Sequence, residues 1–440
     1  MKLLVVLLLS APAAIAQSMP SASNPATQQP TAEPEPFVEG VSGAPLSLDA
    51  LLASARAHNP TLRAAEASIA QSAGQAKQAG LLPNPVIGYQ GDQIRGGSYG
   101  GGEQGGFVEQ TIPLGGKLGL RRDVYRQQQR ADTLALSAQQ QSVEADIESG
   151  FYAALALQQE VDIRKQLSAI AADAAETARQ LANVGQADAP DVLQAEVEQE
   201  QATLDTLTAQ RHYIAAFHQL TAIAGEPDLP LAHLAGDLNS APAQPPSLDT
   251  ILAQSPAVQR ADQAVHVAEA QLRSARREVI PDVTLRAGEQ WNNELVRQNP
   301  NIPTGAQSFA SASIDLPLWN RNQGNVAAAQ AAVELAKAEA ERVRLALRHS
   351  AAPLIEQYNI AAVQSARYKS DLLPRAQRAY ELYRDRYRQM AAAYPQVLVS
   401  QRTLFELQLA SIRSLGELWQ SAARLRHFAI EGSMDAAGTP

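Results

Sequence analysis

The sequence of 440 residues contains no cysteine. A disulfide framework, a thiolate metal site and a cysteine nucleophile are therefore excluded. Aromatic residues are also scarce, at 5% of the chain, whereas alanine, glutamine, leucine, glutamate and arginine are abundant. This composition is typical of long helices that pack closely through small side chains. The formal net charge of −9 argues against nucleic acid as a partner.

Long hydrophobic runs are missing beyond the first residues. No later stretch reaches the roughly 18 apolar residues of a transmembrane helix, so we expect any membrane role to use strands. Residues 1–16 contain Lys2, an apolar run over Leu3 to Leu9 and the cleavage pattern Ala14-Ile15-Ala16. This pattern indicates a secretory signal peptide; the alternative is a buried N-terminal strand. Because no cysteine follows the apolar run, we expect no lipid anchor.

Motifs of catalysis are missing too. The sequence shows no nucleophile–base–acid set, no phosphate-binding loop and no metal cluster, so we expect no enzyme activity and no cofactor. The glycine-rich segment 96–106 lacks a following Lys-Ser/Thr pair and reads as a loop between strands. The seven histidines have no ligand spacing and read as surface or packing residues: His58, His212, His218, His233, His266, His349 and His427.

What the chain does contain is an internal repeat. Leu48-Asp49 returns as Leu248-Asp249, and the stretch 81–86 (LLPNPV) returns as 279–283 (VIPDV). We therefore expect residues 17–45 to be a disordered lead-in, 46–225 and 247–431 to be two copies of one unit, 226–246 to be a linker and 432–440 to be a short tail.

Each copy shows the same order of patterns. It begins with a helix (48–81 and 248–279), followed by a strand hairpin with loops at 95–106 and 297–307 and return strands at 107–114 and 309–318. A very long helix follows (118–184 and 323–390), and a final helix returns (191–224 and 396–430). In the second long helix apolar residues recur every seven positions, a coiled-coil period. Pro353 and Pro374 lie inside it and are expected to kink it.

The strands alternate as a membrane strand does. Val283, Leu285 and Ala287 are predicted to face lipid, and Thr284, Arg286 and Gln290 to face a lumen. Four strands leave two unpaired edges, so the chain must close a barrel with copies of itself. Five aromatic residues are candidates for interfacial girdles, with plain packing as the alternative: Tyr89, Phe107, Trp291, Phe309 and Trp319.

The repeat, the LLPNP/VIPDV pair, PLGGK (113–117), PLWNRNQG (317–324) and the turns GQADAPDVL (185–193) and AAAYPQVL (391–398) resemble the TolC family of outer-membrane efflux factors, most closely its heavy-metal (Czc- and Cus-type) branch. The resemblance implies a mainly α fold with a small β part. In a homotrimer, long antiparallel coiled-coil helices would form an α-barrel in the periplasm, and four strands per chain would form a 12-stranded transmembrane β-barrel in the outer membrane of a Gram-negative bacterium.

It also implies a function and partners. The chain is expected to be the outer-membrane channel of a tripartite efflux system for heavy-metal cations, with a periplasmic adaptor (a membrane fusion protein) and an inner-membrane RND-type pump. Alternatives are a channel for drug efflux or type I secretion, or a periplasmic coiled-coil adaptor or scaffold.

In the family the periplasmic tips contact the adaptor and close the channel. The matching positions are Val184, Gly185, Gln186, Ala187, Asp188, Pro190, Met390, Ala391, Ala392, Ala393, Tyr394 and Pro395. Members often carry acids after the second turn, but Gln396 stands there. The aperture candidates are therefore Asp188, Asp191 and Gln396. Asp191 is also a candidate for capping the return helix.

Overall fold

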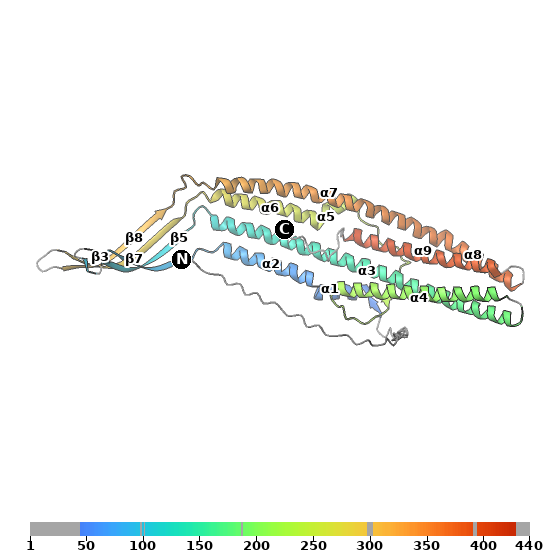
Figure 1. Cartoon of the computed structure of the whole chain (residues 1–440). Helices are drawn as coiled ribbons and strands as arrows, with labels where there is room; N and C mark the ends of the chain where they lie inside the picture. The colour runs from blue at the N-terminus through green and yellow to red at the C-terminus, as the bar shows by residue number, and fades with distance from the viewer. Residues whose placement is uncertain are drawn as a thin grey trace, which may run out of the picture. The chain divides into compact units, whose positions relative to one another are not determined.

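A computed structural model describes residues 45–96, 99–100, 102–185, 188–296, 302–389 and 394–427. The predicted signal peptide (1–16), nearly all of the lead-in (17–45) and the tail (432–440) lie outside these residues. The described part is mostly helical with a small sheet (Figure 1). Its helices are α1 (Leu48–His58), α2 (Pro60–Ala79), α3 (Lys117–Asn183), α4 (Ala189–Ile223), α5 (Leu248–Gln254), α6 (Pro256–Arg277), α7 (Gln323–Arg367), α8 (Leu373–Arg388) and α9 (Tyr394–Arg426).

The main sheet takes two strands from each copy of the repeat. Strands β2 (Val86–Asp92), β5 (Glu103–Ile112), β7 (Val283–Val296) and β8 (Ile302–Ile314) are antiparallel and lie in the order β2-β5-β7-β8. The central pair β5–β7 therefore joins the two copies. Short strands β3 (Arg95–Gly96) and β4 (Tyr99–Gly100) pair with each other, and β1 (Leu46–Ser47) pairs with β6 (Leu234–Ala235).

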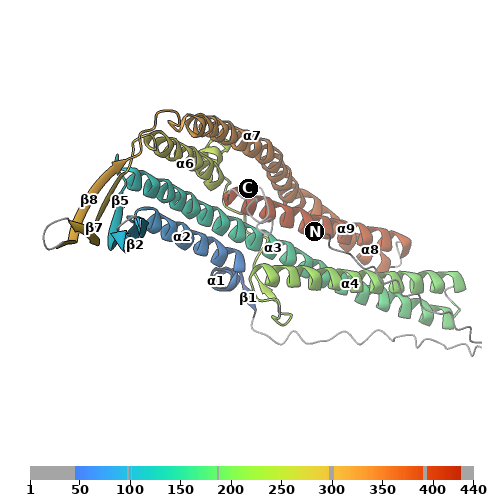
Figure 2. The same ribbon diagram turned by 60° about the vertical axis from the view of Figure 1, so that its left-hand side comes forward.

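Helix α3 is the axis of the helical part. Near the sheet it packs between α2 and α6, with α7 beyond α6; farther along it packs between α4 and α9, with α8 beyond α9 (Figure 2). The larger core forms where α1, α3 and α4 meet, around the fully buried Phe151, Leu155, Phe217 and Leu220. A smaller core surrounds Ile251 and Leu347.

The segment between the copies packs against this core. Tyr213 donates to the carbonyl of Ala232 at 2.6 Å, and the indole of Trp419 donates to the carbonyl of Leu238 at 3.1 Å. Burial, with a smaller contribution from Asp162, raises the pKa of Tyr213 to about 12. The Pro-rich stretch 226–246 is thus held by side chains of both copies at the middle of the bundle.

Two predicted helices are each broken in two. The expected helix 48–81 ends at His58 and restarts at Pro60, and 248–279 ends at Gln254 and restarts at Pro256. A residue before proline is disfavoured in the helical region, and Asn59 and Ser255 are accordingly extended. Asn59 also caps α2, accepting from the Thr61 amide at 2.9 Å. The prediction of continuous helices was wrong at both positions.

The predicted long helix 323–390 is also interrupted, at one proline rather than two. α7 continues through Pro353, whereas residues Tyr368–Leu372 form a π-helical turn just before α8. Pro374 has no N–H to donate and its ring crowds the carbonyl four residues earlier. The wider turn is a common way for a helix to absorb such a defect.

Within the described ranges, no helix combines the length and apolar character needed to cross a membrane.

Candidate functional site: the sheet, its junction with the helices, and the hairpin tips

The sheet has two chemically different faces. On one face apolar side chains are exposed, among them Ile87 (80%), Tyr89 (67%), Trp291 (55%) and Ile314 (52%). The strand register places Ile87, Val108, Ala287 and Ala310 in one row of this face. Val283, Leu285 and Ala287 lie on it, as the alternation predicts. A single acid, Glu289, lies at the level of Tyr89, near the loop end of the strands.

The opposite face is polar and internally bonded. Glu103 accepts hydrogen bonds from Gln290 and Asn292, both at 2.8 Å. Arg286 donates to the Gln90 side chain, and its guanidinium lies 3.7 Å from the centroid of the Phe107 ring. Thr284, Arg286 and Gln290 therefore share one face, as predicted, and the cation–π contact holds Arg286 against the sheet.

Two phenylalanines cover two glycines on this polar face. A Cβ at Gly88 would lie 2.4 Å from the Phe107 ring, and one at Gly288 would lie 2.7 Å from the Phe309 ring. Each pair is directly opposite in the register, Gly88 with Phe107 and Gly288 with Phe309. Phe107 and Phe309 thus pack on the sheet. Of the two roles considered for them, an interfacial girdle and plain packing, the structure favours packing.

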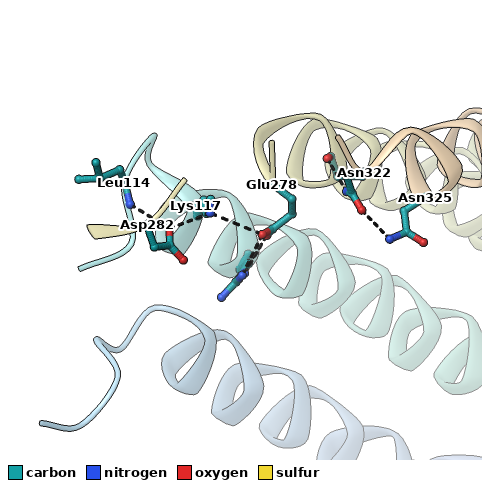
Figure 3. Close-up of polar contacts among 8 residues, drawn as sticks. Leu114, Lys117, Glu278, Asp282, Asn322 and Asn325 are labelled. Carbon is teal, nitrogen blue, oxygen red and sulfur yellow. Dashed lines mark hydrogen bonds and ion pairs between the residues drawn. The ribbon is translucent and has the colours of Figure 1, made fainter. Parts of the chain in front are cut away.

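The strands join the helices through an ion-pair network centred on the buried Lys117 (Figure 3). Lys117, the last residue of PLGGK, is 4% exposed, and its Nζ lies 2.7 Å from Oδ1 of Asp282 in VIPDV and 3.8 Å from Glu278. The Leu114 amide donates to Asp282 at 3.3 Å, and Arg121 donates to Glu278 at 3.0 Å. Burial raises the pKa of Asp282, but the hydrogen bonds from Lys117 and Leu114 outweigh it, so this pKa lies below its ordinary value.

The second junction uses a polar turn instead. Asn322 has a positive φ of 60° just before α7, a conformation that asparagine tolerates. Its amide donates to the carbonyl of Ala275 at 2.8 Å and its Oδ1 accepts from Asn325 at 2.6 Å. These bonds tie the start of α7 to the end of α6 (Figure 3).

The first hairpin tip is only partly described. Val184 (69% exposed), Gly185, Asp188, Pro190 and Asp191 lie at the turn between α3 and α4 and are all exposed. Gly185 has a φ of 73°. The predicted tip residues Gln186, Ala187, Met390, Ala391, Ala392 and Ala393 lie outside the described residues, as does the side chain of Tyr394.

The return helices begin as the prolines predict. Pro190 lies in the first turn of α4 and Pro395 in that of α9. Asp188 occupies the N-cap position, although its side chain makes no capping bond to a described residue, and Asp191 lies in the first turn. Val397 is buried, whereas Gln396 is exposed. Whether these residues line an aperture stays a prediction.

Polar clamps between the copies were not anticipated from the sequence. Glu160 on α3 accepts from Arg164 at 3.1 Å and from Arg413 on α9 at 3.0 Å, and Arg164 pairs with Asp205 on α4 at 2.6 Å. Nearer the sheet, Glu148 pairs with Arg426 at 2.6 Å. The acids Glu160 and Glu148 stand at mostly apolar positions of the long helix, which is only a weak sign of an ion pair. Their partners on α9 lie 253 and 278 residues away in sequence.

A sheet with one apolar and one polar face, attached to long antiparallel helix pairs, is the fold of outer-membrane channel proteins. The family model "Outer membrane efflux protein" matches residues 51–226 and 247–429. The chain therefore belongs to the outer membrane efflux protein family. It is an outer-membrane efflux protein and not an enzyme.

Relatives agree with this assignment. The cobalt-zinc-cadmium resistance protein CzcC of Cupriavidus metallidurans is 26% identical over 383 residues, covering 87% of this chain and 89% of CzcC. The nickel-cobalt-cadmium resistance protein NccC of Alcaligenes xylosoxydans xylosoxydans is 25% identical over 301 residues, covering 67% and 66%. The crystal structure of CusC, solved in work on its folding and transmembrane channel formation, has a TM-score of 0.71 at 18% identity, covering 88% of this chain and 92% of that one.

Proposed function

We propose that three copies of the chain close a 12-stranded transmembrane β-barrel, continuous with a helical tunnel in the periplasm. The observation that carries the proposal is the sheet itself. Its edge strands β2 and β8 have no further neighbour among the described strands, and one of its faces exposes apolar side chains. Unpaired edges are not tolerated in lipid, so the edges must pair between copies.

The internal repeat predicts the register of that pairing. Within the chain, Gly105 on β5 lies opposite both Gln90 and Gln290, and Gln290 lies opposite Gln307 on β8. Repeating the β5–β7 pairing across the edge would place Gln307 of one copy opposite Gln90 of the next. The two halves, 46–225 and 247–431 with their linker 226–246, would then contribute equally to the barrel.

A disulfide test of this register uses the cysteine-free sequence. Cysteines introduced together at Gln90 and Gln307 should form disulfide-linked trimers in outer membranes under mild oxidation. A matched pair at Tyr89 and Gln307 lies on opposite faces and should not link. Monomers only from the Gln90–Gln307 pair, in protein that is inserted in the outer membrane, would contradict the barrel.

We infer that the cargo is a heavy-metal cation. The names of CzcC and NccC support this proposal, and the polar face of the described sheet carries Asp92, Glu103 and Glu109 against one cation, Arg286. A conduit passes its cargo without a resident cofactor. Expression with a matching pump and adaptor should restore growth of an efflux-deficient strain on cobalt, zinc or cadmium salts. Restored growth only on drugs would favour drug efflux.

We further propose that residues 1–16 direct secretion, and that the hairpin tips dock to a periplasmic adaptor of an RND-type pump. The exposed tip residues are Val184, Gly185, Asp188, Pro190, Asp191, Pro395 and Gln396. They offer an apolar apex with acids beside it. Crosslinking from photoreactive residues at Val184 should capture the adaptor in cells; failure there, with normal trimers, would move docking elsewhere.

A further inference from the structure

The apolar face of the sheet does not stop where the strands stop. On β8 every second residue of this face is small or apolar through Ala310, Ala312 and Ile314, and the alternation continues into the loop at Leu316 (70% exposed) and Leu318 (58% exposed). β5 continues in the same way from Ile112 to Leu114. The loop then presents Trp319, which is 86% exposed.

The length of this face fits the membrane only when the loop is included. Trp291 lies at the end of the apolar face nearest the hairpin loops, and it pairs with Ala306 on β8. A membrane barrel needs an apolar band ~25 Å tall from strands tilted by ~40°. At ~3.4 Å per residue, that height requires about ten residues along β8, which reaches Leu316. Trp319 therefore lies just beyond the band, at the level of the periplasmic headgroups.

Exposed arginines lie at the same junction between strands and helices. Arg276 and Arg277 end α6, Arg122 lies in the first turns of α3, and Arg321 follows Trp319; all four are exposed. The bond from Asn322 to Ala275 holds the Arg321 turn beside the end of α6. Among the described residues, no carboxylate forms an ion pair with any of these four arginines. Glu278 and Asp282, the first acids that follow Arg277 in the sequence, are engaged by Lys117 and Arg121.

We propose that Trp319 and three of these arginines, Arg276, Arg277 and Arg321, bind anionic phospholipid in the periplasmic leaflet of the outer membrane. The inference rests on the proposed membrane-inserted sheet. Trp319 occupies the boundary between headgroups and acyl chains, where tryptophan is favoured. The guanidiniums bind lipid phosphates by charge-assisted hydrogen bonds.

Charge favours lipid over a second copy as the occupant of this surface. In the proposed barrel the edge of the next copy that meets β8 is β2, and the position before β2 that corresponds to Asp282 is the uncharged Asn84, so no carboxylate is supplied there. Anionic lipid brings the opposite charge. This cluster of positive charge lies in a chain whose formal net charge is −9.

The three tryptophans of the chain provide the test. Trp419 is buried (8% exposed), Trp291 lies on the apolar sheet face, and Trp319 lies at the junction. Three variants, each keeping one tryptophan with the other two changed to phenylalanine, are placed in vesicles of phosphatidylethanolamine and phosphatidylglycerol that contain brominated lipids. Bromines near the headgroups should quench Trp319 and Trp291, and Trp419 should be unaffected.

The outcomes separate the inference from the function it rests on. Quenching of Trp291 without quenching of Trp319 overturns the anchor and leaves the membrane sheet standing; Trp319 is then covered by a second copy. Absence of quenching at both positions contradicts the inserted sheet itself.

Lipid selectivity is tested separately. The triple variant Arg276→Gln, Arg277→Gln, Arg321→Gln should lose most of the preference for phosphatidylglycerol over phosphatidylcholine, at least several-fold, in native mass spectrometry of the trimer. A control, Arg348→Gln, Arg378→Gln, Arg386→Gln, removes the same charge from exposed sites on α7 and α8 and should keep the preference. Equal loss in both variants would mean that lipid binding follows net charge only.

Discussion

Nζ of Lys117 in the first copy of the repeat lies 2.7 Å from Oδ1 of Asp282 in the second. Replacing Lys117 by methionine leaves Asp282 and Glu278 without their shared cation in a site where Lys117 itself is buried. A broken buried pair costs ~3–5 kcal/mol, and because Asp282 is one-third exposed we expect about 2 kcal/mol. The measurement is the midpoint of guanidinium unfolding in detergent.

Arg121→Met is the control for this variant. Arg121 shares Glu278 but is 44% exposed, so its loss should cost no more than about 1 kcal/mol. Equal losses in the two variants would show that the burial of Lys117 is not what makes the network important.

Phe107→Ala should destabilise the sheet by uncovering Gly88. A fully buried phenylalanine costs ~3–5 kcal/mol on truncation, and at this half-buried site we expect about 2 kcal/mol. Phe309→Ala should have the same effect through Gly288. Phe107→Leu, which still covers the glycine, should recover more than half of the loss in thermal unfolding of the trimer; recovery of none would assign the effect to the Arg286 contact instead.

Leu285→Arg and Gln290→Arg compare the two faces of one strand. Leu285 is 44% exposed on the apolar face, and an arginine there should cost ~2–4 kcal/mol near the bilayer midplane. Gln290 lies on the polar face beside Glu103, which an arginine can still engage. The yield of outer-membrane protein should fall only for Leu285→Arg, and equal damage at both positions would refute the assignment of faces.

The Glu160 clamp should give stability that is lost in acid. Burial raises the pKa of Glu160, but the hydrogen bonds from Arg413 and Arg164 outweigh it, so the folded pKa lies below the ordinary 4.5. Its contribution is therefore complete above pH 4.5 and disappears as the pH falls through the folded pKa. Arg413→Gln should cost about 1 kcal/mol at pH 7 and less at pH 3, measured by thermal unfolding across pH. A pH-independent loss would rule out this linkage.

The tip requires a variant that leaves the backbone intact. Because Gly185 has a φ of 73°, a side chain there adds strain as well as bulk. Val184→Glu changes an exposed apolar residue without that complication and should abolish efflux while trimers still assemble. Gly185→Asn adds a polar side chain that tolerates the left-handed conformation, and it should also impair efflux because Gly185 lies in the same docking surface. If Val184→Glu exports normally, the docking assignment is wrong.

Much of this architecture can be predicted from local patterns in the sequence. The period of seven predicts the long helices, and the alternation in 283–290 predicts which residues share a sheet face. The breaks at Asn59 and Ser255 are also visible in the sequence, in Pro60 and Pro256 that follow them. Ala55 and Leu62, however, are seven positions apart and favour a continuous helix across Asn59. The π-helical turn before Pro374 and the passage through Pro353 depend on how the surrounding helices pack, which a single proline does not reveal.

The polar contacts were the harder part. PLGGK and VIPDV are visible as motifs, yet their pairing requires β5 to lie beside β7, a relation between residues about 165 positions apart. The Glu160 and Glu148 clamps likewise become visible only when α9 lies against α3.

The Lys117–Asp282 pair is made once in the chain, although the repeat offers two places for it. The residue that corresponds to Asp282 in the first copy is Asn84, which is exposed and precedes the free edge strand β2. An acid in place of Asn84 would need a cation from another molecule as its partner, whereas asparagine carries no charge. The seam that closes within the chain thus carries an ion pair, whereas the position that corresponds to Asp282 beside the open edge is uncharged, so no carboxylate is left without a cation there before the edge is paired.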